Sequence, residues 1–326
     1  MKDTVVMKST LYRTLSSKFK KRTWLKLVFS AIALLTVVAC GNSKLILGPL
    51  YNRLDNQIRN EFNKLGDFTD EQSSDFEQRL QTYHLWHRRQ QLPRYAALLD
   101  EMVATVGQEG QTTEVDIRRW FASVEGFSIS ARSCHPVNYS FEFMKSLTDD
   151  QVNFIEARFA NQQKKNQERY NSRTREERLK RRHANILKWS GRIGFQFTSE
   201  QKAMLKDTFE KQISLRKQYW VLSAQWNKDF FTLARKQQLL DYDPRMQKQL
   251  NKLWNLLEDN ETENWSANRQ LWNTFFNDFV NSMTNTQRSW VNSWVSKLAR
   301  TLRDMSDDSV RFENTRGEID PSLGCV

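Results

Sequence analysis

A short pattern occurs four times in this chain and predicts where four helices begin. Each copy places a Thr after an apolar residue, a Gln three positions later, and apolar residues seven and eleven positions after the Thr. A Thr at a helix N-cap accepts a hydrogen bond from the third helical N–H, and a Gln at that position reaches back to the N–H of the Thr. The predicted N-caps are Thr69, Thr148, Thr198 and Thr284.

Apolar residues elsewhere in the chain follow the same helical spacing. Trp290, Trp294, Leu298 and Leu302 form one such stripe, and the alternation typical of strands is scarce. The chain also has only 10 Gly and 5 Pro residues to interrupt helices. We therefore predict an all-α fold, an elongated bundle of long amphipathic helices that follows an N-terminal signal peptide.

The spacing of the four copies suggests two pairs. The first and second copies lie 79 residues apart and the third and fourth lie 86 apart, with 50 residues between the second and the third. This grouping predicts two related helical halves, residues 49–190 and 191–310, followed by a C-terminal tail at 311–326. Capping boxes are common, so four independent origins of the same capping chemistry are an equal alternative to duplication.

The first 39 residues have the layout of an export signal. Residues 1–26 contain eight basic residues and one acidic residue, and residues 27–39 carry no charge. This uncharged run is shorter than the roughly 20 residues that a membrane-spanning helix needs. We expect residues 1–39 to be a signal peptide, and both Met1 and Met7 are candidate start sites.

The end of the uncharged run, Val37–Cys40, resembles the bacterial lipobox. In proteins with this motif the signal is removed before the Cys, whose thiol receives a diacylglycerol and whose amino group is usually fatty-acylated. The resemblance implies that Cys40 attaches the protein to a membrane and that residues 40–48 form a tether. Cys40 is followed by Gly41–Asn42 and not by an Asp. By resemblance to sorted lipoproteins, this implies that the protein is located at the periplasmic face of the outer membrane and is not retained at the inner membrane. The alternatives are an ordinary secretory signal with a chance Cys, or an uncleaved anchor.

Most of the positive charge belongs to the predicted signal. The chain has a formal net charge of +12, of which residues 1–39 contribute +7, so the remainder carries about +5. A basic excess of this size does not indicate a nucleic-acid partner, and we predict none.

Because the tether is short, we also expect Leu45–Leu47 and Tyr51 to touch the membrane.

Two cysteines remain after Cys40. In an oxidising compartment an even number of cysteines favours a disulfide, which here would join Cys134 to Cys325 and hold the C-terminal tail. Closing a loop of nearly 200 residues would stabilise the fold by about 5 kcal/mol in the chain-entropy account. Two reduced thiols are the alternative.

The sequence contains no pattern that specifies catalysis. It has no Gly-rich phosphate loop, no Gly-x-Ser-x-Gly elbow and no His-Glu-x-x-His helix. His84 and His87 are spaced to share a metal ion on a helix, but the spacing supplies no third ligand, and zinc needs three or four. The alternative to metal binding is that both histidines make polar contacts beside a buried Trp86. We therefore predict no catalytic residue, no cofactor and no metal site.

The stretch Ala160–His183 is strongly basic and has few large apolar residues. We expect it to form one helix. Either this helix bridges the two halves in solvent, held by Arg–Glu pairs, or it presents a cationic surface to an envelope partner. In the second case, the contact residues would be Arg169, Arg173, Arg178 and Arg182.

Two families share features with this chain. Tyr51–Asp55, Trp86–Arg89 and Leu92–Ala96, together with the lipobox, resemble an uncharacterised family of proteobacterial lipoproteins, which implies a helical lipoprotein without an assigned activity. The repeated Thr-x-x-Gln is also similar to the Spy-type and CpxP-type periplasmic proteins, which are small helical cradles for unfolded clients or a sensor kinase. This chain is longer, is expected to be lipidated, and has four copies, of which only one follows a Leu.

These features lead us to expect a non-enzymatic outer-membrane lipoprotein that faces the periplasm. It would bind an unidentified envelope protein or polymer through its helix faces. A Spy-like holdase is the first alternative, and an exposed concave patch of basic and aromatic residues would favour it. A hydrolase of envelope polymers is the second, and it would need His84 or His87 to meet carboxylates in a pocket.

Overall fold

The computed structural model describes residues 51, 53–106, 112–139, 141–260 and 262–308. Within these residues the fold is a helical bundle without strands, which confirms the all-α prediction. None of the helices in these residues combines the length and the hydropathy that crossing a bilayer requires.

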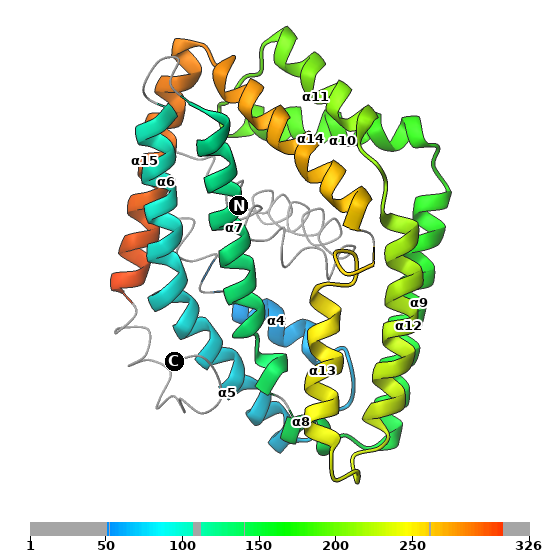
Figure 1. Ribbon diagram of the computed structural model, residues 1–326. Coiled ribbons are helices and arrows are strands. Elements are labelled where there is room, and N and C mark those ends of the chain that lie inside the picture. Colours follow the sequence, from blue (N-terminus) through cyan, green and yellow to red (C-terminus); the bar gives the residue numbers. More distant parts are fainter. Residues whose placement is uncertain (1–50, 52, 107–111, 140, 261, 309–326) are drawn as a thin grey trace, which may run out of the picture.

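The helices follow one another with short connections (Figure 1). In chain order they are α4 (Leu54–Phe62), α5 (Asp70–Trp86), a π-helical turn (His87–Gln91), α6 (Leu92–Val106), α7 (Glu114–Ser133), a 3₁₀ turn (Pro136–Tyr139), α8 (Phe141–Lys145), α9 (Asp149–Asn171), α10 (Arg175–Arg192), α11 (Ser199–Lys211), α12 (Arg216–Ala234), α13 (Tyr242–Trp254), α14 (Thr262–Asn281) and α15 (Asn285–Asp307).

The four threonines of the repeated pattern are helix N-caps in the structure. Thr69, Thr148, Thr198 and Thr284 begin α5, α9, α11 and α15, and each has both hydrogen bonds of a capping box. The positions of these helix starts therefore follow from local backbone chemistry.

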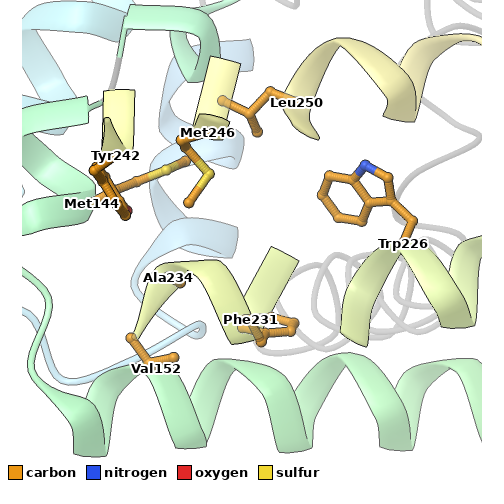
Figure 2. Close-up of a cluster of buried hydrophobic side chains, with 8 residues drawn as sticks. All are labelled: Met144, Val152, Trp226, Phe231, Ala234, Tyr242, Met246 and Leu250. Atoms are coloured by element: carbon orange, nitrogen blue, oxygen red, sulfur yellow. The ribbon is translucent and has the colours of Figure 1, made fainter. Parts of the chain in front are cut away.

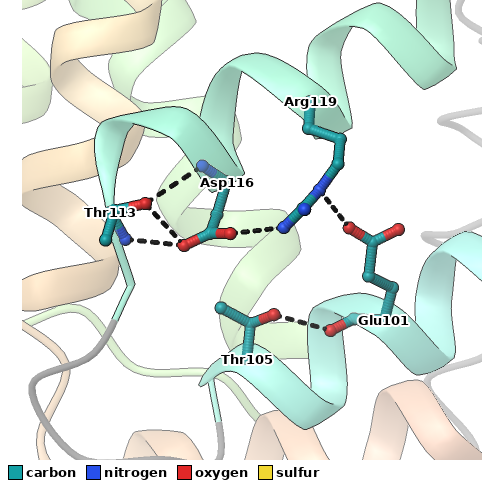
Figure 3. A network of polar contacts seen from close by, with 5 residues as sticks. All are labelled: Glu101, Thr105, Thr113, Asp116 and Arg119. Carbon is teal, nitrogen blue, oxygen red and sulfur yellow. Dashed lines mark hydrogen bonds and ion pairs between the residues drawn. The ribbon is translucent and has the colours of Figure 1, made fainter.

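Two further capping boxes use an acidic residue in place of Gln. Thr113 caps α7 with Asp116, and Thr174 caps α10 with Glu177. Figure 3 shows how Arg119 extends the first of these boxes, because it pairs with Asp116 and, at 2.7 Å, with Glu101 of α6. The hydrogen bonds from Thr113 hold the pKa of the Asp116 carboxyl below its usual value. This network fixes the start of α7 against the end of α6.

The Gln residues of the first two copies also hydrogen-bond to each other. Gln72 Nε2 lies 3.2 Å from Gln151 Oε1, and Gln151 Nε2 lies 2.9 Å from Gln72 Oε1. Gln72 also donates to the carbonyl of Ser146 at 2.9 Å, and Gln151 donates to the carbonyl of Asp67 at 2.8 Å. The starts of α5 and α9 are thereby joined side chain to side chain.

The third and fourth copies repeat this arrangement. Gln201 and Gln287 exchange amide hydrogen bonds at 3.0 and 2.7 Å. Gln201 donates to the carbonyl of Ser282 at 3.1 Å, and Gln287 donates to that of Gln196 at 2.7 Å. The accepting carbonyl lies two residues before the capping Thr in both pairs, so the two junctions match atom for atom.

The helices of the two halves are exchanged in a reciprocal way. α6 of the first half lies along α15 of the second, and α12 of the second half lies along α9 of the first (Figure 1). The helix after the first junction helix of each half therefore packs on the second junction helix of the other half. Reciprocal contacts of this kind are those of a two-fold arrangement, and they favour the interpretation of two related halves.

The hydrophobic cores are shared between the halves. Figure 2 shows one cluster, in which Met144 and Val152 of the first half pack with six residues of the second, Trp226, Phe231, Ala234, Tyr242, Met246 and Leu250. A second cluster joins Leu92 and Ala96 to Leu298 and Met305. The expected boundary between residues 190 and 191 falls inside α10, which packs on α11 of the second half.

Candidate functional site

The segment that follows the tether is locked into a buried joint. Tyr51 is 3% exposed and packs with Leu92 and Ala96 of α6 and Leu302 of α15. Its hydroxyl lies 2.6 Å from Nδ1 of His87, and the Tyr95 hydroxyl lies 3.4 Å from Nε2 of the same ring. Our expectation that Tyr51 touches the membrane is therefore wrong, because its ring is needed to fill this joint.

Arg88, next to His87 in the chain, links this joint to α15. Its side chain is 2% exposed, its guanidinium lies 4.9 Å from the centre of the Tyr51 ring, and it donates to the carbonyl of Met305 at 2.8 Å. Asp55, one helical turn after Tyr51, is also buried. The three sequence stretches that resemble the lipoprotein family thus meet at one place.

A π-helical turn shapes this joint. The N–H of Leu92 donates to the carbonyl of His87, five residues earlier, and Pro93 follows immediately. Pro93 has no N–H for an ordinary helical bond to Arg89, so the wider turn accommodates it without ending the helix. The turn widens the helix where His87 and Arg88 face Tyr51.

Burial decides the charge of the histidines near this joint. Removal from water lowers the pKa of His87 to about 4, with a smaller contribution from the positive charge of Arg88. Burial also lowers the pKa of His135 to about 4 and raises the pKa of Tyr51 well above its ordinary value. Both imidazoles are therefore neutral at pH 7.

The spacing of His84 and His87 is used for packing in this fold. The His84 ring lies 4.6 Å from the Tyr51 ring, edge to face, and the His87 ring contacts Tyr95 in the same way at 5.5 Å. Among the residues that the structure describes, no three His, Cys, Asp or Glu side chains are grouped closely enough to hold a metal ion.

A surface groove of about 410 Å³ lies beside the π-helical turn. It runs between the start of α6 and the last turns of α7, and neither His84 nor His87 lines it. The lining residues are Trp86, Gln90, Gln91, Arg94, Ile129, Ser130, Ser133 and Cys134.

Gln91 is the unusual member of this lining. Its side chain is 1% exposed, and its Oε1 has no hydrogen-bond partner among the described residues. A buried carbonyl oxygen without a donor costs about 1–3 kcal/mol. Arg94, on the rim, is exposed, donates to Ser130 Oγ at 3.1 Å and lies over the Phe127 ring. The groove thus combines unused polar capacity with an apolar wall of Trp86 and Ile129.

A second hollow of about 390 Å³ lies between α4 and α5. Its charged residues, Arg59 and Glu77, form a two-pronged ion pair with each other, with both bonds at 2.5 Å. Because their polar groups already satisfy one another, this hollow offers less to a ligand than the groove beside the π-helical turn.

The basic stretch Ala160–His183 does not form one helix, so that prediction is wrong. α9 ends at Asn171 and α10 begins at Arg175, because the capping box of Thr174 with Glu177 starts a new helix. Among the described residues, α10 also lacks the Arg–Glu pairs that the bridging alternative requires. In the part of the chain that the structure describes, no carboxylate lies within 4 Å of the basic groups of α10.

The four arginines of the predicted contact surface have different surroundings. Arg178 donates to the carbonyls of Tyr170 and Arg173 and lies 3.8 Å over the Tyr170 ring, so it holds the elbow between α9 and α10. Arg182 lies 4.2 Å over the Phe209 ring and donates to Gln212 Oε1. Arg169 and Arg173 are partly exposed. Two of the four residues therefore serve packing.

The cysteine predictions fall mostly outside the described residues. Cys40 and Cys325 both lie there, so lipidation of Cys40 stays a prediction. Cys134, at the end of α7, is 8% exposed and disulfide-bonded. Its partner also lies outside the described residues, and the pairing with Cys325 stays a prediction.

A family of unknown function (DUF6279) matches residues 64–260, from just before α5 to just after α13. The chain belongs to this family. The matched region contains the π-helical turn, the groove and the first three copies of the capping pattern. No curated protein and no solved structure matches the chain.

Proposed function

We propose that this protein is a non-enzymatic, lipid-anchored binding protein of the cell envelope. Cys40 would attach it to the periplasmic face of the outer membrane, and a surface of the helical bundle would bind an envelope protein or polymer. The lipobox supports the location, and the structure of the joint around Tyr51 supports a firm attachment of the bundle to its tether.

The groove beside the π-helical turn is the observation that carries the binding role. It brings the buried, unpartnered Gln91 carbonyl together with Arg94, serine hydroxyls and the apolar Trp86 and Ile129. Peptide and glycan chains carry polar groups beside apolar surface, so they would pair with the exposed Arg94 and pack on Ile129. Pairing with Gln91 Oε1 would also require the Gln91 side chain to turn toward the groove, because this atom is buried. The joint beneath keeps the groove rigid, because both are built on the same helical turn.

In-cell photocrosslinking tests this proposal. A benzoylphenylalanine at Gln90, which is exposed and lines the groove, should give a covalent adduct that affinity capture recovers. Gln78 is the matched control, since it is an exposed glutamine on the same helical run about 18 Å away and outside the groove. Equal adducts at both positions, or none at Gln90, would contradict a binding role for the groove.

A holdase of the Spy type is a second candidate, and one observation favours it. Arg178 stacks on Tyr170, and Arg182 stacks on Phe209 and Trp272. Phe209 is buried, so the accessible part of this basic and aromatic region consists of the two arginines with the partly exposed Tyr170 and Trp272. A holdase should slow the aggregation of a reduced, unfolding client in a turbidity assay. Unchanged aggregation at a molar excess of this protein would remove that candidate.

A further inference from the structure

α10 lies on the surface of the molecule and buries none of its residues. Leu179 and Ile186 pack against the cluster formed by Leu205, Phe209 and Phe275, and Arg182 covers the Phe209 ring. One side of the helix is therefore occupied by α11 and α14, and the opposite side faces solvent.

The charge of α10 is large and uncompensated. The helix contains seven basic and two acidic residues, a net +5 that equals the charge of all residues after the predicted signal. Arginines elsewhere, such as Arg59, Arg235 and Arg269, pair with carboxylates of neighbouring helices. In the described residues, the basic groups of α10 have no such partner.

Four of these cations share the outer face of α10. At about 100° per residue, Lys180, Arg181, Lys188 and Arg192 fall within an arc of roughly 120°, and all four are exposed. Ala184 and Gly191 lie between them, and the exposed Glu177 of the first turn falls in the same arc. Trp189 is 42% exposed and lies about 60° beyond this arc, next to Arg192, whose guanidinium lies 4.4 Å over its ring.

We propose that the outer face of α10 docks onto the anionic phospholipid headgroups of the membrane to which Cys40 attaches the chain. This inference rests on the lipid anchor of the proposed function and goes beyond it. A helix face with four spread cations and, in the described residues, no carboxylate within 4 Å of them suits a layer of phosphates better than one shaped ligand. An exposed Trp beside cationic residues is typical of a side chain at headgroup depth.

The length of the tether permits this contact. The eleven residues from Cys40 to Leu50 span at most about 40 Å when fully extended. A domain of this length has a radius of gyration of about 18 Å, so the tether lets the bundle turn different faces to the same membrane. Contacts between the four cations of α10 and lipid headgroups would then favour one orientation of the bundle relative to the membrane among those that the tether allows.

Photocrosslinking of the full chain in phosphate-labelled cells tests the proposal. A benzoylphenylalanine at Ala184, in the middle of the outer face, should attach radioactive phospholipid to the protein. The lipid anchor itself contributes no phosphate to this signal. Val221 of α12, which is 71% exposed, is the control position and should give no labelled adduct.

Charge reversal gives the matched variants. Lys180→Glu, Arg181→Glu, Lys188→Glu and Arg192→Glu together should lower the lipid adduct at Ala184 at least tenfold, an order-of-magnitude estimate for four charges near an anionic surface. The same number of reversals on α12, α13 and the loop between them should leave the adduct unchanged, and all four of those positions are exposed: Lys228, Lys236, Lys248 and Lys252. Thermal unfolding should confirm that both variants fold.

Two results would overturn the proposal. An adduct between Ala184 and a protein, in place of lipid, would show that α10 binds an acidic protein surface. The absence of any adduct from an anchored protein would show that the face is merely solvated. Failure of the anchor is distinguishable from both, because wild-type protein and Cys40→Ser would then fractionate alike.

Discussion

Two pairs of glutamines, of which all but Gln151 are buried, join the starts of four helices, and they explain why the Gln of the capping pattern matters beyond its own helix. Gln201 is 0% exposed and contributes to its own capping box, to the Ser282 carbonyl and to Gln287. An amide can do all three because it has two N–H donors and a carbonyl acceptor. A Glu at this position would place a charge in the same buried site.

Truncation of this amide should destabilise the fold. We expect Gln201→Ala to lower the free energy of unfolding by about 2 kcal/mol, because it leaves buried donors and acceptors without partners. Gln225→Ala, which removes an exposed amide, is the control. In urea denaturation, Gln201→Ala and Gln287→Ala together should cost less than the sum of the single changes. Additive costs would show that the two amides do not act as a pair.

The buried histidines predict the acid sensitivity of the fold. The pKa of His87 is about 4 in the folded protein and about 6.5 in an unfolded chain. Between these values the unfolded chain binds a proton that the folded protein does not, so stability should fall as the pH drops from about 6.5 to about 4.

His135 contributes in the same direction, since its folded pKa is also about 4. His87→Asn should therefore remove about half of the stability loss that chemical denaturation detects between pH 7 and pH 4.5, a loss of up to about 3 kcal/mol per histidine. An unchanged pH dependence in this variant would mean that the pKa of His87 is the same in the folded protein and in the unfolded chain.

At the scale of elements, the capping pattern predicts where helices begin, but no pattern in the sequence predicts the π-helical turn. The Thr-x-x-Gln pattern predicts the starts of α5, α9, α11 and α15 but does not include Thr113 and Thr174, whose partners are Asp and Glu. A pattern that allowed Gln, Asp or Glu three residues after the Thr would predict a new helix at Thr174 and so divide the basic stretch Ala160–His183 into two helices. A proline inside a helical pattern favours a kink or an end, yet in the structure the helix runs through the π-helical turn into α6, where His87 meets Tyr51.

The elbow between α9 and α10 should depend on one arginine. Arg178→Met removes two hydrogen bonds to backbone carbonyls and the contact with the Tyr170 ring, so we expect a loss of about 2 kcal/mol in unfolding free energy. Arg181→Met, on the exposed face of the same helix, should change stability by less than about 0.5 kcal/mol. Thermal unfolding compares the two, and similar shifts would show that the elbow does not rely on Arg178.

At the scale of the molecule, the groove illustrates what a single sequence leaves undetermined. Its walls come from residues 86–94 and 129–134, and nothing in their spacing indicates that they face each other. The end of α7 reaches the π-helical turn only because α6 and α7 fold back on one another. The spacing of apolar residues predicts helices and the layout of the N-terminus predicts export, but neither pattern predicts which helix faces remain open.

The shared cores predict that the halves depend on each other. A protease site inserted between Ser172 and Arg173 would cut the chain at the elbow. After cleavage and reduction, the two fragments should stay associated, because α6 packs on α15 and α12 on α9. Each fragment prepared alone should lack cooperative unfolding by circular dichroism. Fragments that separate and remain folded would contradict the reciprocal exchange of helices.

The central claim is that this helical bundle is a lipid-anchored envelope protein, and fatty-acid labelling tests it most directly. Cells that express the tagged wild-type chain or Cys40→Ser would be fed an alkyne fatty acid, and the captured protein would be scored for label and for membrane fractionation. We predict that wild-type protein carries the label and sediments with the outer membrane, and that Cys40→Ser loses both properties. Label that persists on Cys40→Ser, with unchanged fractionation, would contradict the claim.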